Sequence, residues 1–156
     1  MRISIAVLLI MWCLVSNAQT NWLQTNVLTS YSGVSQTLTY NRQVSSFNYG
    51  LGILQNYSQA AFPWSQAPGL CGQLGYELAS NEKLTSNVHL LTLFYPSLLS
   101  RFTEAYVGYD VKYDLSERWG ADSFVSFGVF NESGPNGSYV IGGFSYCVSF
   151  GISYRL

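Results

Sequence analysis

The chain has 156 residues, of which 48% are hydrophobic, 16% are aromatic and 10% are charged, and its formal net charge is −1. Soluble globular domains carry about 25% charged residues, so a water-exposed surface built from this chain would be poor in ions. The near-neutral charge gives no reason to expect a nucleic-acid partner, and the length corresponds to one domain.

The N-terminal segment has the pattern of a cleaved secretory signal. Arg2 gives a short basic start, an apolar run covers residues 3–15, and Ser16, Asn17 and Ala18 form a small-x-small cleavage site. The apolar run is shorter than the ~20 residues that a transmembrane helix requires. The sequence therefore predicts a signal peptide over residues 1–18 and a mature domain over residues 19–156.

Alternation of polar and apolar residues predicts eight β-strands in the mature chain. In chain order they cover about residues 22–31, 34–43, 47–58, 70–79 and 84–95, two strands within 104–130 on either side of the turn at 116–119, and 139–156. The fifth strand has the least defined register, because Leu90, Leu91 and Leu93 break its alternation. Strands of this length match the ~9–11 residues with which a tilted strand crosses a bilayer.

The connections between the predicted strands alternate in length after a brief first turn. Those around residues 44–46, 80–83 and 115–118 are short, whereas those around 60–69, 96–103 and 131–138 are longer. Short periplasmic turns and longer external loops are typical of outer-membrane barrels. An even number of strands would place both chain ends on the periplasmic side.

The charged residues of segment 104–130 raise the question of which face is inside. Glu104, Asp110, Lys112, Asp114 and Asp122 alternate with Val107, Tyr109, Val111, Tyr113, Val125 and Phe127. Soluble ligand-binding barrels and membrane barrels can both have eight strands, so the strand count does not separate them. The polar faces contain many Ser, Thr, Asn and Gln residues and the glycines at 50, 52, 75, 108, 120, 128, 143 and 151. This composition predicts that the polar face lines a narrow lumen and the apolar face contacts lipid.

Aromatic residues near the strand ends predict two girdles at the membrane interfaces. Trp22, Tyr113, Trp119 and Tyr154 would lie near the periplasmic ends, and Tyr31, Tyr57 and Phe94 near the outer ends.

The last predicted strand carries the most specific pattern of the chain. Phe144, Tyr146, Val148, Phe150, Ile152 and Tyr154 alternate with small or polar residues before the ending "SFGISYRL". With this strand, the mature chain resembles the small eight-stranded bacterial outer-membrane β-barrels, in the class of outer membrane protein X. In such families the terminal strand is a sorting signal, although this chain ends in Leu156 instead of the commoner phenylalanine.

The resemblance implies an all-β fold, an eight-stranded antiparallel up-and-down transmembrane β-barrel over residues 19–156. It also implies localisation in the outer membrane, contact with outer-membrane lipid and lipopolysaccharide, and insertion by the barrel-assembly machinery.

The candidate chemical residues do not form a recognised site. Lipid A deacylases of similar size use a His-x-Ser arrangement, but the single histidine here lies in His89-Leu90-Leu91. No zinc-ligand spacing and no phosphate-binding glycine loop occurs, so we expect no catalytic residues, metal ligands or cofactor. The charges of segment 104–130 are interpreted as a satisfied lumenal network, and Cys71 and Cys147 as small half-buried residues.

The sequence predicts an integral outer-membrane barrel without catalytic activity, with a lumen filled by polar side chains. Its external loops would serve adhesion, envelope integrity or contact with a partner that the sequence does not identify. A secreted soluble lipocalin-like barrel with a hydrophobic ligand is the second interpretation. A lipid-modifying barrel enzyme is the third.

Overall fold

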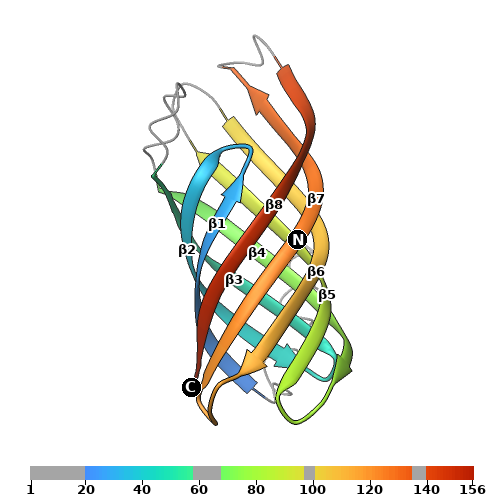
Figure 1. Cartoon of the computed structure of the whole chain (residues 1–156). Coiled ribbons are helices and arrows are strands. Elements are labelled where there is room, and N and C mark those ends of the chain that lie inside the picture. The colour runs from blue at the N-terminus through green and yellow to red at the C-terminus, as the bar shows by residue number, and fades with distance from the viewer. Residues whose placement is uncertain (1–19, 58–67, 97–100, 135–139) are drawn as a thin grey trace, which may run out of the picture.

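The computed structural model describes residues 20–57, 68–96, 101–134 and 140–156, and in it eight antiparallel strands close into one barrel (Figure 1). The strands are β1 (Thr20–Ser30), β2 (Gly33–Val44), β3 (Phe47–Asn56), β4 (Gly69–Ser80), β5 (Leu84–Pro96), β6 (Arg101–Asp114), β7 (Trp119–Ser133) and β8 (Val140–Arg155). Each strand pairs with its neighbours in the chain, and β1 pairs with β8. The predicted eight-stranded up-and-down barrel is confirmed. The predicted signal peptide lies outside the described residues.

The two ends of the barrel differ in their connections. One end, which we call the terminal end, holds Thr20, Arg155 and the turns at residues 45–46, 81–83 and 115–118. The opposite end, the loop end, holds the tight turn at residues 31–32 and the longer connections. Much of those longer connections lies outside the described residues. Within the part of the chain that is described, no helix has the length and hydropathy to span a membrane.

The strands are unequal in length, so the loop end is uneven (Figure 1). β7 and β8 have 15 and 16 residues, whereas β1 and β3 have 11 and 10. β7 and β8 remain paired up to Ser133 and Val140, but β8 pairs with β1 only up to Val148 and Thr29. Among the described residues, the segment 140–147 of β8 therefore has no strand on its β1 side.

The apolar side chains lie on the outside of the barrel and the charges lie inside. Leu51, Phe127 and Phe144 are 72%, 75% and 92% exposed, whereas Glu104 is 0% exposed. Asp110 and Asp122 are also buried. Successive residues of a strand point to opposite faces, so this inversion holds along whole strands. The predicted orientation of the faces is confirmed.

The register of β5 is now defined. His89, Leu91, Leu93 and Tyr95 point into the lumen and are buried, while Leu90 on the same strand is exposed. A β-bulge between Glu77 and Ala79 shifts the pairing of β4 with β5 near the terminal end. The lumenal leucines made this strand look apolar on both faces in the sequence.

The lumenal face is crowded where glycines lie opposite neighbouring strands. A Cβ at Gly52 would meet the carbonyl oxygen of Leu38, and a Cβ at Gly108 would meet that of Val125. At both positions the atom in the way belongs to backbone, so only glycine lets the adjacent strands keep this spacing.

Two residues of the predicted aromatic girdles do not face outward. Trp22 is 8% exposed and points into the lumen, because it alternates with Leu23 on β1. Tyr31 is 41% exposed, but it lies in the β1–β2 turn and its ring stacks on that of the inward-facing Phe130, with ring centroids 3.6 Å apart. Trp119 and Tyr154 do contact each other on the outside, in a T-shaped pair 4.9 Å apart. The height of Trp22 along β1 fits a girdle, but the alternation of the strand places its side chain in the lumen.

Candidate functional site

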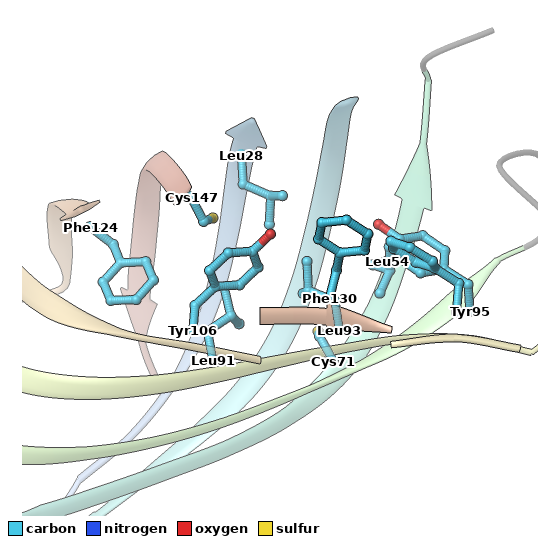
Figure 2. Packing of buried hydrophobic residues seen from close by; sticks show 11 residues of the cluster. Leu28, Leu54, Cys71, Leu91, Leu93, Tyr95, Tyr106, Phe124, Phe130 and Cys147 are labelled. Carbon is cyan, nitrogen blue, oxygen red and sulfur yellow. The ribbon is translucent and has the colours of Figure 1, made fainter. Parts of the chain in front are cut away.

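The half of the lumen near the loop end contains an apolar cluster (Figure 2). Its members are Leu28, Leu54, Cys71, Leu91, Leu93, Tyr95, Phe102, Tyr106, Phe124, Phe130 and Cys147. All of them are buried and stand at inward positions of their strands. The expectation that polar side chains fill the lumen is therefore wrong for this half, because inward leucine and aromatic residues fill it.

A buried carboxylate fastens the β1–β2 turn to the inside of the barrel. Glu104 Oε1 accepts a hydrogen bond from the Ser32 backbone N–H at 2.9 Å, and Glu104 Oε2 accepts from Ser30 Oγ at 2.9 Å and from Ser32 Oγ at 3.2 Å. Gly33 follows with a φ of 98°, which favours glycine and allows the tight turn. These charge-assisted bonds satisfy a carboxylate that would otherwise be costly to bury.

Further contacts hold the same turn over the mouth of the barrel. The Tyr95 hydroxyl lies 3.0 Å from Ser32 Oγ, and Asn56 Nδ2 donates to the Ser32 carbonyl oxygen at 2.8 Å. The Tyr31 ring in the same turn stacks on Phe130 and on Phe102. The turn and the apolar cluster together obstruct the lumen at the loop end.

The half of the lumen near the terminal end is polar. Gln24 Nε2 donates to Asp122 Oδ2 at 2.9 Å, and Asn87 Nδ2 donates to Asp110 Oδ2 at 2.9 Å. Asn41 Nδ2 donates to Gln24 Oε1 at 3.0 Å. Side-chain amides from β1 and β5 thus donate to the carboxylates of β7 and β6, and Asn41 of β2 holds the Gln24 amide in place.

The predicted charged residues separate into two places. Asp110, Lys112, Asp114 and Asp122 line a cavity of about 60 Å³ at the terminal end, whereas Glu104 lies with the turn at the loop end. Lys112 Nζ lies 4.6 Å from the centre of the Trp22 ring. Arg155 Nη2 lies 3.4 Å from Asp114 Oδ2 at the cavity edge. Asp110, Asp114 and Asp122 each have a hydrogen-bond or ion-pair partner, but Asp122 Oδ1 has none among the described residues, so the predicted satisfied network is found only in part.

His89 stands at the inner limit of this cavity. Its side chain is 8% exposed, its ring lies 5.1 Å from the Phe124 ring, and its Nε2 has no hydrogen-bond partner among the described residues. In the same part of the chain, no three His, Cys, Asp or Glu side chains are grouped as metal ligands. Cys71 and Cys147 are free and fully buried in the apolar cluster instead of half-buried.

Sequence reasoning did not find Trp22, Gln24 or Asn87 as lumenal partners of the charges. The sequence did indicate that these side chains point into the lumen, because each residue occupies an inward position in the alternation of its strand. What the sequence lacked was the register between strands, which places Asn87 opposite Asp110.

Comparison with known proteins identifies the fold. No family model and no curated protein sequence matches the chain. The solved N-terminal β-barrel domain of Pseudomonas aeruginosa OprF superposes with a TM-score of 0.55 at 12% identity, covering 89% of this chain and 99% of that one. The chain has the fold of a small outer-membrane β-barrel. A porin, KdgM, in complex with disordered oligogalacturonate, aligns with a TM-score of 0.32 at 8% identity, covering 85% of this chain and 98% of that one.

The outer-membrane barrel fold is consistent with the inverted faces and with the dimensions of the lumen. A soluble barrel would leave Leu51 and Phe127 in water, where exposed apolar surface of this extent is rare. The cavity at the terminal end is too small and too polar for the hydrophobic ligand of a lipocalin-like protein. The soluble interpretation therefore fits the structure poorly.

Proposed function

We propose that this chain is an integral protein of a bacterial outer membrane that has no catalytic activity and whose lumen is closed to solutes. The observation that carries the proposal is the ring of exposed apolar side chains around the barrel. Val27, Leu38, Leu51, Leu74, Val88, Val107, Val125 and Phe150 provide one such residue on each strand. This surface is suited to outer-membrane lipid and lipopolysaccharide. Export by a signal peptide over residues 1–18 and insertion by the barrel-assembly machinery belong to the same proposal.

The apolar cluster and the fastened β1–β2 turn support a closed lumen. Water and ions pass through a barrel only where polar groups line a continuous path, and eight strands leave an interior that side chains can fill. Tyr95, Phe102 and Tyr106 are each 0% exposed within that interior.

The uneven loop end supports contact with an external partner as the role of this barrel. With the terminal end in the periplasm, the ends of β6 to β8 project outward beyond β1 to β3. Within the described part of the chain, residues 140–147 have no strand partner on the side that faces β1, and such strand edges pair with extended segments of other proteins.

The position of His89 argues against the lipid-modifying alternative. His89 lies inside the barrel wall, while lipid lies outside it. A general base must reach the proton that it removes, so this histidine is poorly placed to hydrolyse a membrane lipid.

Electrophoresis after refolding in detergent tests the membrane-barrel proposal. A closed strand ladder resists SDS, so unheated protein should migrate differently from boiled protein, and cell fractionation should place the protein in the outer membrane. Identical migration of verified folded and boiled samples would count against the proposal. An aqueous, detergent-independent monomer would support the lipocalin-like alternative.

Planar-bilayer recording tests the closed lumen separately. The inserted barrel should give no steady conductance, because the apolar cluster interrupts the lumen. Stable channels in the wild-type barrel would contradict this part of the proposal and leave the membrane location intact.

A further inference from the structure

The cavity at the terminal end carries more negative charge than its own residues neutralise. Its lining includes the carboxylates of Glu77, Asp110, Asp114 and Asp122 and the cations Lys112 and Arg155. At their usual protonation states, four carboxylates and two cations give the lining a formal net charge of −2. Arg155 pairs with Asp114. Lys112 attracts both Asp110 and Asp122, but one cation offsets only one of these two carboxylates, which also repel each other.

Two buried polar atoms in this cavity have no partner among the described residues. They are Asp122 Oδ1 and His89 Nε2, and their side chains are 6% and 8% exposed. A buried polar atom without a partner is costly, and native structures satisfy nearly all of them with protein, water or ligand. Both residues line the cavity, so a bound molecule there can reach them.

The available atoms match the N–H groups of a cation. Asp122 Oδ1 is an acceptor, neutral histidine offers one acceptor nitrogen, and the second oxygen of a carboxylate such as Asp110 can accept further bonds. An ammonium group carries three N–H donors and a positive charge. A tightly coordinated metal ion fits less well, because the described residues contain no group of three His, Cys, Asp or Glu ligands.

Little of the cavity wall is apolar, so only a short alkyl group fits beside an ammonium group. Lys112 already covers the Trp22 ring, and Phe124 lies outside the lining, against the His89 ring. The volume of about 60 Å³ excludes bulky cations.

From these observations we infer that the cavity at the terminal end binds the primary ammonium group of a small alkylamine, held between Asp110, Asp122 and His89. In the proposed orientation of the barrel this site opens toward the periplasm, but the binding itself does not depend on that orientation.

Titration calorimetry of the refolded barrel in detergent tests the site with n-propylammonium as the probe. Saturable binding of one equivalent is expected for the wild type. Tetramethylammonium has the same charge without N–H donors and should bind at least about tenfold more weakly, because charge-assisted hydrogen bonds supply the difference. Sodium and magnesium chloride at matched ionic strength should not compete beyond screening.

Matched variants locate the site. Asp122→Asn keeps the shape of the side chain and should weaken n-propylammonium binding by about tenfold or more. His89→Leu removes the unpartnered nitrogen and should weaken it severalfold. Glu82→Gln removes a carboxylate from an exposed turn outside the cavity and should leave the affinity within about twofold.

The heat-dependent shift in electrophoresis verifies that each variant is folded. If Asp122→Asn does not fold, Asp110→Asn replaces it.

Three results would overturn the inference. They are absence of saturable n-propylammonium binding to folded wild type, equal binding of tetramethylammonium, and an unchanged affinity in folded Asp122→Asn or Asp110→Asn protein. None of these results bears on whether the chain is a membrane barrel, which the electrophoresis decides.

Discussion

Neighbouring residues on one strand of this barrel meet opposite environments. Val125 lies near the middle of β7 and is 54% exposed on the outer face. Ser126 is 1% exposed, and its Oγ donates to the Cys147 carbonyl oxygen at 3.1 Å inside the barrel. The effect of a substitution on stability therefore depends on whether its position points to the outer face or to the lumen.

We predict that Val125→Arg lowers the free energy of unfolding by about 2–4 kcal/mol, the range for a basic residue on the lipid face of a barrel near the midplane. Chemical unfolding in lipid vesicles measures the change. Val125→Leu is the matched control and should change stability by less than about 0.5 kcal/mol. Equal stability of the two variants would mean that Val125 does not face lipid.

Glu104→Gln should destabilise the barrel by about 1.5–3 kcal/mol, because the neutral amide loses charge-assisted bonds and turns an N–H₂ group toward the donors of Ser30 and Ser32. Hydrogen exchange at the Ser32 amide should accelerate along with the loss of stability. Glu117→Gln, at an exposed turn, should change neither quantity. A slowly exchanging Ser32 amide in the Glu104→Gln variant would show that the carboxylate does not fasten this turn.

At the scale of the strand, glycine has different roles on the two faces of the sheet. Gly108 lies against the backbone of β7 on the lumenal face. Gly72 has the outward parity of β4, and the nearest atom to a Cβ there would be Leu51 Cδ2 at 3.8 Å. The same substitution at the two positions should therefore have opposite effects.

Gly108→Ala should cost about 1–3 kcal/mol of stability, since β7 would have to move away from β6. Gly72→Ala should be neutral or stabilise by up to about 1 kcal/mol, because alanine reduces the freedom of the unfolded chain. Unfolding of both variants under one condition gives the comparison. Similar losses at the two sites would contradict the assignment of faces.

The alternation of polar and apolar residues in the sequence was sufficient to predict the strands and which of their side chains point inward. The outward valines and the inward Asp110 and Asp122 follow directly from a period of two residues. The contact of Asp110 with Asn87 could not be predicted, because it depends on the register between β5 and β6. The stacking of Tyr31 on Phe130 depends on a turn fastened by Glu104, which lies 72 residues away from Ser32 in the chain.

At the scale of the whole molecule, the closed sheet protects its interior from reagents in water. Cys71 and Cys147 lie in the apolar cluster, where solvent enters only when the barrel opens. Their reactivity is therefore a measure of global unfolding.

A water-soluble maleimide should leave Cys71 and Cys147 unmodified in the folded barrel and add two labels after denaturation, as mass spectrometry of residues 19–156 would show. Ser80→Cys, at an exposed position of β4, should be labelled in the folded state and serves as the accessible control. Rapid labelling of the native cysteines in folded protein, or no labelling of denatured protein without a reductant, would be inconsistent with two buried free thiols.

The pairing of β1 with β8 determines the order in which this chain can fold. This seam joins Trp22 to Arg155, and it contains eight residue pairs, whereas β7 and β8 share fifteen. Bringing together ends so distant in sequence has a large entropic cost before any seam hydrogen bond forms, so the local hairpins should form first and the seam last. Until β8 has emerged from the ribosome, every partly folded intermediate has two open edges that can pair with other chains. The edges of the early hairpins must therefore be kept from pairing with other chains until β8 is available, and the barrel closes in a single late event.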